Sequence, residues 1–168
     1  MRILKFIAAT AIAIALSTPA FALGGPYFGF NYSTLDLEIP HNSDADIDYI
    51  SGTIGQYVHP NLAVELRAGL GIDDDRVDGV KVEVDYLVGA YGRVVYPVQR
   101  FVPYFLFGVT GAKVSAGSDD ESEMDLGYGF GTDYIITDQL SMNVEYANII
   151  DGSDIDITSF SIGLRFSY

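Results

Sequence analysis

The chain has 168 residues and a formal net charge of −14, with 23 Asp and Glu against 9 Lys and Arg. It contains no basic patch that could neutralise phosphates, which argues against nucleic acid as a partner, and without cysteine it can form neither disulfides nor thiolate metal sites. Twelve Tyr, ten Phe and 18 Gly favour a protein of many β-strands with girdles of aromatic residues.

The N-terminus has the organisation of a cleavable export signal. Arg2 and Lys5 precede the apolar run 6–16, and small residues ending in an Ala-Phe-Ala motif follow it. The apolar run is too short to span a bilayer as a helix, which takes about 20 residues. We therefore expect a signal peptide over residues 1–22 and one exported domain over residues 23–168.

Eight segments of the remaining chain alternate apolar with polar or small residues, and this period of two is typical of β-strands. The pattern leaves open which face of the second and fifth segments points outward. Their lengths suffice for a tilted strand to cross a membrane, which takes about 9–11 residues. In chain order the segments are 27–37, 47–57, 62–72, 80–94, 101–114, 124–135, 140–150 and 157–168.

The connections between these segments alternate in kind. Short turns follow the second, fourth and sixth segments, whereas acidic stretches that we interpret as loops follow the first, third, fifth and seventh, at 38–48, 73–78, 119–125 and 151–156. Alternate connections of an up-and-down meander lie at opposite ends, and outer-membrane barrels have extracellular loops at one end and periplasmic turns at the other. The sequence predicts an all-β fold, an eight-stranded antiparallel up-and-down transmembrane β-barrel with its apolar face toward lipid and both termini in the periplasm.

The last segment has the clearest alternation. A last strand that pairs with the first leaves a barrel without edges, so we expect it to close the barrel on residues 27–37. Its apolar, outward positions are Phe160, Ile162, Leu164, Phe166 and Tyr168.

Charged residues on the inward faces form the strongest candidate site. An Arg or Lys facing lipid at the midplane costs about 2–4 kcal/mol, so we expect these residues to pair inside the lumen, with Arg165 meeting Glu145 on the neighbouring strand. The network could be a gate, but side chains alone can fill an eight-stranded lumen, and we favour a salt-bridged plug. The six residues are Glu65, Arg67, Arg93, Asp133, Glu145 and Arg165.

Several of these residues also carry a family resemblance. The segment Gly131-Thr-Asp-Tyr134 before Asp138-Gln-Leu-Ser141, the pair Glu145-Tyr146 and the aromatic last strand resemble the small outer-membrane β-barrel proteins of the opacity-type porin group, similar to the OmpA-like barrel domain. The resemblance covers the whole mature chain. It implies an architecture rather than an activity, and it implies that the last strand is the signal read by the barrel-assembly machinery.

We expect no catalytic, cofactor or metal site. His41-Asn-Ser43 has the His-x-Ser spacing of lipid A deacylases, but in that family the pair lies on a lipid-facing strand of the C-terminal half, and here it lies in the first acidic stretch. The stretch that begins at Asp44 is not an EF-hand, because Tyr49 replaces the required Gly and Gly55 the required Glu.

These observations predict an integral protein of the outer membrane of a Gram-negative bacterium with a structural or surface-interaction role. A small porin that passes ions or small solutes is the alternative, and a lipid A-modifying hydrolase is a remote one. The expected partners are outer-membrane lipid, lipopolysaccharide and the assembly machinery. Weak bridging of Ca²⁺ or Mg²⁺ to lipopolysaccharide phosphates by the acidic stretches is a further hypothesis, set against solvated charge that only repels aggregation.

Overall fold

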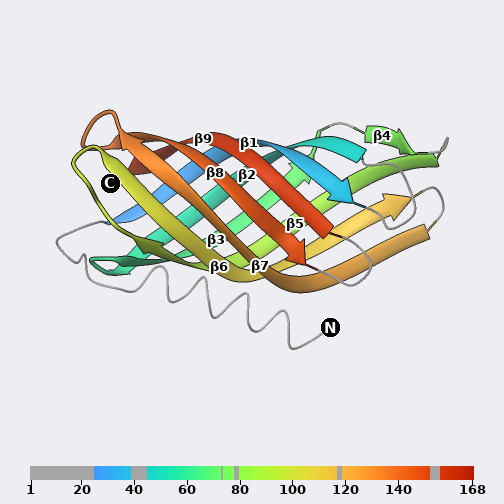
Figure 1. The fold of residues 1–168 in the computed structure, drawn as a ribbon, viewed down its shortest axis with the longest axis horizontal. Helices are drawn as coiled ribbons and strands as arrows, with labels where there is room; N and C mark the ends of the chain where they lie inside the picture. The colour runs from blue at the N-terminus through green and yellow to red at the C-terminus, as the bar shows by residue number, and fades with distance from the viewer. Residues whose placement is uncertain (1–24, 39–44, 73, 78–79, 117–118, 152–155) are drawn as a thin grey trace.

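The computed structural model describes residues 25–38, 45–72, 74–77, 80–116, 119–151 and 156–168. The predicted signal peptide, the His41-Asn-Ser43 motif and parts of the acidic stretches lie outside these ranges. In the described ranges, no helix is both long and apolar enough to span a membrane. The strands are β1 (Pro26–Glu38), β2 (Ala45–His59), β3 (Leu62–Gly71), β4 (Asp74–Val77), β5 (Val80–Val95), β6 (Phe101–Ala116), β7 (Asp119–Ile135), β8 (Leu140–Asp151) and β9 (Asp156–Ser167) (Figure 1).

The strands form one closed antiparallel barrel. They pair in the order β3-β2-β1-β9-β8-β7-β6-β5-β4, and a further pairing of β3 with β5 closes the ring. The short β4 pairs with β5 beyond the end of β3, so it continues the third strand of the wall and the barrel is eight-stranded, as predicted. The predicted closure is also confirmed, because β9 pairs with β1 and places Phe166 opposite Phe28.

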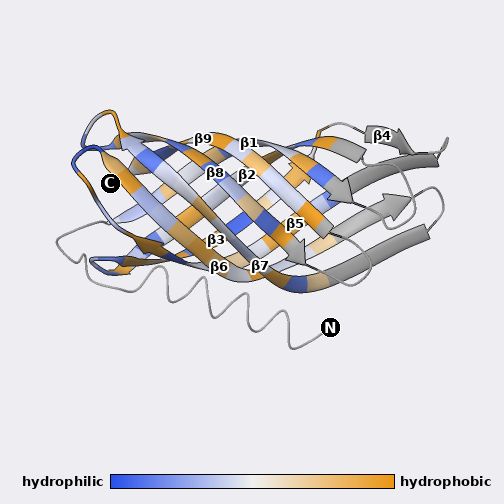
Figure 2. Ribbon diagram, viewed as in Figure 1, coloured by the Kyte–Doolittle hydropathy of each residue, from blue (hydrophilic) through white to orange (hydrophobic). Residues whose placement is uncertain are grey.

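The alternation along each strand sorts side chains between the two surfaces of the wall (Figure 2). Phe30 and Phe130 point outward and are 62% and 63% exposed, as the apolar pattern predicts. The structure also settles the two faces that the sequence leaves open. In β6 the side chains of Phe105 and Phe107 are exposed, and in β2 those of Ile50 and Ile54; their immediate neighbours on the inward face, such as Leu106 and Thr53, are buried.

All four stretches predicted as acidic loops contain strand residues: β2 already begins at Ala45, and the outer residues of 151–156 belong to β8 and β9. β6 and β7 pair continuously up to Ala116 opposite Asp119, so the stretch 119–125 belongs to β7, and the stretch 73–78 contains β4. The interpretation as loops was wrong there because polar side chains indicate only that a segment is exposed to water. They do not show whether its backbone hydrogen bonds are made in a ladder, and two paired strands can continue beyond an apolar barrel wall.

Inward glycines make room for tyrosine rings. A Cβ atom built on Gly55 would collide with the ring of Tyr27, and one on Gly131 would lie 2.6 Å from a ring carbon of Tyr104. Both pairs follow from register, since Tyr27 lies opposite Gly55 and Tyr104 opposite Gly131. Eight strands enclose a lumen that is just wide enough for side chains, so a large ring needs a neighbour without a side chain.

We expect Gly131→Ala to destabilise the barrel by about 1–3 kcal/mol, the usual cost of an overpacked core. The added methyl group would meet the Tyr104 ring and the backbone oxygen of Val144, and the latter cannot move without breaking the wall. The measurement is the urea midpoint of protein folded in lipid vesicles. Gly52→Ala is the matched control, because its Cβ would meet only the Ala68 oxygen at 4.0 Å; equal midpoints for the two variants would contradict the packing argument.

Candidate functional site in the barrel interior

The six predicted charged residues all lie inside the barrel, near the end that carries the short turns. Five are at most 5% exposed as whole residues, and the Arg67 side chain is 15% exposed. Five strands position them, because an inward residue of one strand lies beside inward residues of the next. β3 supplies Glu65 and Arg67, β5 supplies Arg93, β7 supplies Asp133, β8 supplies Glu145 and β9 supplies Arg165.

Arg67 joins two carboxylates. Its guanidinium donates to Glu145 through Nη1 at 2.5 Å and through Nη2 at 2.9 Å, which is the two-pronged geometry that favours Arg over Lys. Its Nε and Nη2 also donate to Glu65 at 2.9 and 2.7 Å. Glu145 accepts a further bond from the Tyr104 hydroxyl at 2.9 Å.

Asp133 lies between two arginines. Its Oδ2 accepts hydrogen bonds from Arg93 at 2.5 Å and from Arg165. Glu65 links this group to Arg67, since its Oε1 lies 3.6 Å from nitrogens of both Arg93 and Arg165. The six residues are therefore one connected network of three acids and three bases with no net charge.

One predicted pair within this network is wrong. Arg165 contacts Asp133 and Glu65, whereas Glu145 contacts Arg67. Register explains the difference: on β8 the residue opposite Arg165 is Ser141, four residues from Glu145. Four residues of strand separate their backbones by about 13 Å, so neighbouring strands do not guarantee neighbouring charges.

Tyrosines complete the site, and the sequence analysis missed them. Each of three arginine guanidinium carbons lies near the centre of a tyrosine ring. The distance is 3.8 Å for Arg93 and Tyr104, 5.0 Å for Arg165 and Tyr27, and 5.1 Å for Arg67 and Tyr91. The Tyr27 hydroxyl donates to Glu65 at 2.7 Å. The aromatic content was interpreted only as a sign of outer girdles, although the inward parity of these three tyrosines was a usable signal.

Other described side chains fill the lumen on both sides of the charged network. Toward the turn end, Val95, Val102 and Tyr104 form an apolar cluster with Tyr57 and Ile135 packed against it. On the other side of the charged network, inward polar side chains of strands that lie close together in the wall bond to one another. Ser33 and Ser161 meet at 2.7 Å, Asn143 donates to Asn31 at 2.8 Å, and Tyr91 bonds Thr110.

Two cavities adjoin the network. One of about 30 Å³ is lined by Arg67, Glu145 and the polar side chains beyond them, and it has room for a single water or two. The other, of about 630 Å³, opens at the turn end and reaches Asp133 and Arg165. We call it the vestibule. The charged network therefore stands between the vestibule and the rest of the lumen.

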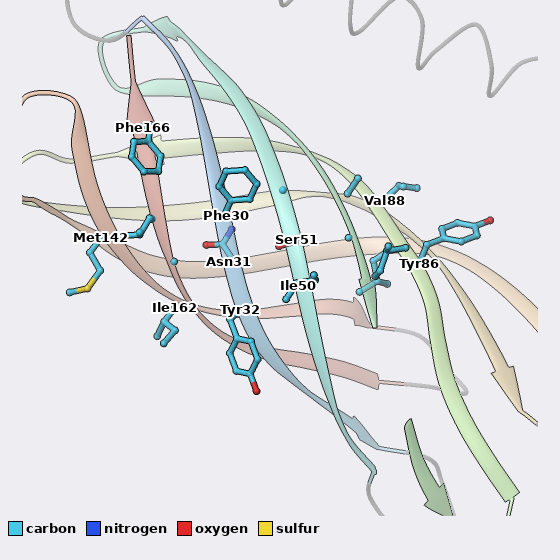
Figure 3. A pocket seen from close by; sticks show the side chains of 17 residues that line it. Phe30, Asn31, Tyr32, Ile50, Ser51, Tyr86, Val88, Met142, Ile162 and Phe166 are labelled. Atoms are coloured by element: carbon cyan, nitrogen blue, oxygen red, sulfur yellow. The ribbon is translucent and has the colours of Figure 1, made fainter. Parts of the chain in front are cut away.

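A third hollow, of about 990 Å³, lies on the outer surface (Figure 3). Outward side chains from β1, β2, β3, β5, β8 and β9 surround it, among them Phe30, Ile50, Val88, Met142 and Ile162. Such a lining offers dispersion contacts and little hydrogen bonding, which suits alkyl chains. It agrees with the predicted lipid-facing side.

No metal or histidine chemistry emerges from the described residues. Within the ranges given above, no group of three or more His, Asp or Glu is placed to hold a metal ion. His59 lies exposed at the end of β2, where its Nδ1 accepts a weak 3.4 Å bond from the Asn61 backbone.

A closed antiparallel barrel with an apolar outer surface and a charged interior is the architecture of transmembrane β-barrels of the outer membrane. The comparison with known families agrees: the chain belongs to the outer membrane protein beta-barrel domain family, whose model matches residues 6–167. No curated protein matches the chain.

Solved structures show the same fold. Neisserial surface protein A is similar with a TM-score of 0.65 at 16% identity, over 86% of this chain and 97% of that chain. Ail of Yersinia pestis, in complex with the heparin analogue sucrose octasulfate, is similar with a TM-score of 0.65 at 14% identity, over 86% of this chain and 99% of that chain. OprG of Pseudomonas aeruginosa is similar with a TM-score of 0.64 at 13% identity, over 86% of this chain and 96% of that chain.

Proposed function

We propose that the protein is a structural outer-membrane barrel whose interior charge pairs form a plug, and that it conducts no ions through its centre. The observation that carries the proposal is the interior itself. Among the described residues, the cavity on the inner side of the network of paired charges measures only about 30 Å³, which is too small for a hydrated ion and its path. The role in the envelope is then to occupy the membrane and to present a surface at the end opposite the short turns.

The test is electrical recording of the native protein in a planar lipid bilayer. A plugged barrel gives no defined conductance step under conditions where folding is verified by the different electrophoretic mobility of boiled and unboiled samples. Regular steps from the unsubstituted protein would refute the plug.

One observation favours the alternative of a small porin. The vestibule of about 630 Å³ already leads from the turn end to Asp133 and Arg165. In the described part of the chain, the network and the polar layer beyond it are what closes the rest of the path. A porin would pass ions without any substitution, and the same recording therefore separates the two functions.

The acidic stretches at the end of the barrel opposite the short turns favour ligands with positive charge. Ail was crystallised with a polyanion, but the acidic stretches of this chain and its net charge of −14 do not favour such a ligand. We extend the proposal to weak bridging of Ca²⁺ or Mg²⁺ between these stretches and lipopolysaccharide phosphates. The test is thermal unfolding in lipopolysaccharide-containing membranes. A melting temperature that does not change with millimolar calcium would contradict the bridging by divalent cations.

We also propose that the chain is exported by cleavage after Ala22 and that β9 is the strand recognised by the barrel-assembly machinery. The apolar side chains of Phe160, Ile162 and Leu164 point outward, and Phe166 stacks on Phe28 with ring centres 5.1 Å apart. Phe166→Ala should slow assembly by purified machinery severalfold. Phe130→Ala, an outward substitution on β7, is the control, and equal slowing of both would argue against a signal in β9.

A further inference from the structure

β7 is longer than its pairing with β8. It pairs with β6 from Asp119 to Tyr134, but with β8 only from Tyr128 to Ile135. Among the residues that the structure describes, the segment 119–126 therefore has a strand neighbour on one side only. Figure 1 shows the ends of β6 and β7 reaching further along the barrel axis than those of β8 and β9.

Among the described residues, no strand pairs with the backbone groups of this segment that point away from β6. The N–H of Leu126 donates at 2.7 Å to the carboxylate of Asp125, its own neighbour, in an exposed position. Such a local bond competes with a ladder and forms where a ladder partner is missing. N–H and C=O groups of alternate residues point to the same side, so those of Met124 and residue 122 lie along the same open edge. At about 3.3 Å per residue, the edge is about 25 Å long.

The charge of the segment selects the occupant. An exposed strand edge is a template for an added strand from another chain. The sequence Asp119-Asp-Glu-Ser-Glu-Met-Asp125 contains five acids and no base. Pairing with the same edge of a second copy would place acids opposite acids, which is destabilising, whereas Lys or Arg opposite them is favourable.

We propose that residues 119–126 of β7 are a docking edge for an extended, basic segment of another protein, which adds to the barrel wall as a further strand. Backbone hydrogen bonds supply the affinity, and alternating Lys or Arg side chains supply the selectivity. The proposal deepens the surface interaction put forward above and does not depend on the plug. A conducting barrel could still dock the segment, so the two can fail separately.

The test uses the full protein in lipid nanodiscs and a fluorescent peptide of alternating Lys and Val, ten residues long. Fluorescence anisotropy should show binding, and hydrogen exchange should show new protection of the amides that face the open edge, those of residue 122, Met124 and Leu126. A peptide of the same sequence with every backbone nitrogen methylated keeps its charge and cannot donate. It should bind at least about tenfold more weakly, because tenfold corresponds to one or two hydrogen bonds and the methylated peptide loses more donors than that.

Two variants locate the site. Met124→Pro removes an N–H that points to the open edge and leaves the β6 ladder intact, so it should weaken binding about tenfold. Glu121→Lys should weaken it about fivefold through like charge, and Asp138→Lys in the turn between β7 and β8 is the matched control, with no change.

Equal affinity for the methylated and unmethylated peptides would overturn the proposal, because it would mean that charge alone attracts the peptide. Absence of binding to the native protein, or protection confined to other strands, would overturn it as well. Met124→Pro could fail to fold, which its electrophoretic mobility with and without boiling would show. The affinities of the methylated and unmethylated peptides for the native protein then still test the proposal.

Discussion

Replacing Arg93 by Leu should lower the free energy of unfolding by about 3–5 kcal/mol, the cost of leaving a buried charge without its partner. The Arg93 side chain has no exposure to solvent, its Nη2 donates to Asp133 at 2.5 Å, and its guanidinium lies on the Tyr104 ring. Without it, three carboxylates share two arginines. The urea midpoint of protein folded in lipid vesicles measures the loss.

A compensating substitution separates charge imbalance from lost packing. Arg93→Leu combined with Asp133→Asn leaves two acids and two bases in the network, so it should recover a large part of the stability lost by Arg93→Leu alone. Arg100→Leu, in the exposed turn between β5 and β6, should stay within about 0.5 kcal/mol of the native protein. A double variant no more stable than the single one would mean that the network is not held together by its charge balance.

Removing both ends of the plug should turn a silent barrel into a conducting one. Arg67→Ala with Glu145→Ala empties the layer beside the small cavity, and Asp133→Ala with Arg165→Ala empties the floor of the vestibule. Each pair removes one acid and one base, so Glu65 and Arg93 remain as a neutral pair. Bilayer recording of the fourfold variant should show steady conductance steps where the native protein shows none.

The two pairs made separately are the controls. Each should give smaller or briefer openings than the fourfold variant, because one layer still blocks the path. A fourfold variant that is folded, as judged by its mobility before and after boiling, and that stays silent would place the barrier elsewhere. The apolar cluster around Val95, Val102 and Tyr104 would then be the barrier to test.

The outer surface could be predicted from the sequence in detail, because strand geometry leaves a residue only two directions. Once Phe160, Ile162 and Leu164 alternate with Ser and Gly, the apolar set shares one face, and the structure puts it outside. The same parity put Arg93 and Glu65 inside. Where the alternation was weak, as in β2 and β6, the sequence could not choose the face, and packing against the neighbouring strands decided it.

The partners within the lumen could not be read from the sequence. Arg67 and Glu145 are 78 residues apart and lie on strands that do not pair with each other, so their bond exists only because the closed barrel brings opposite walls together. The tyrosines that lie over the arginines depend on glycines across the register, such as Gly131 opposite Tyr104.

The sequence by itself determined the number of wall strands, the direction of most side chains and the apolar outside of this protein, because these follow from a period of two along one chain. The tertiary structure alone decided which charges meet, how completely they fill the lumen and which part of β7 has an open edge. Those features depend on register and on barrel closure, which relate residues that are distant in the chain and carry no local signal.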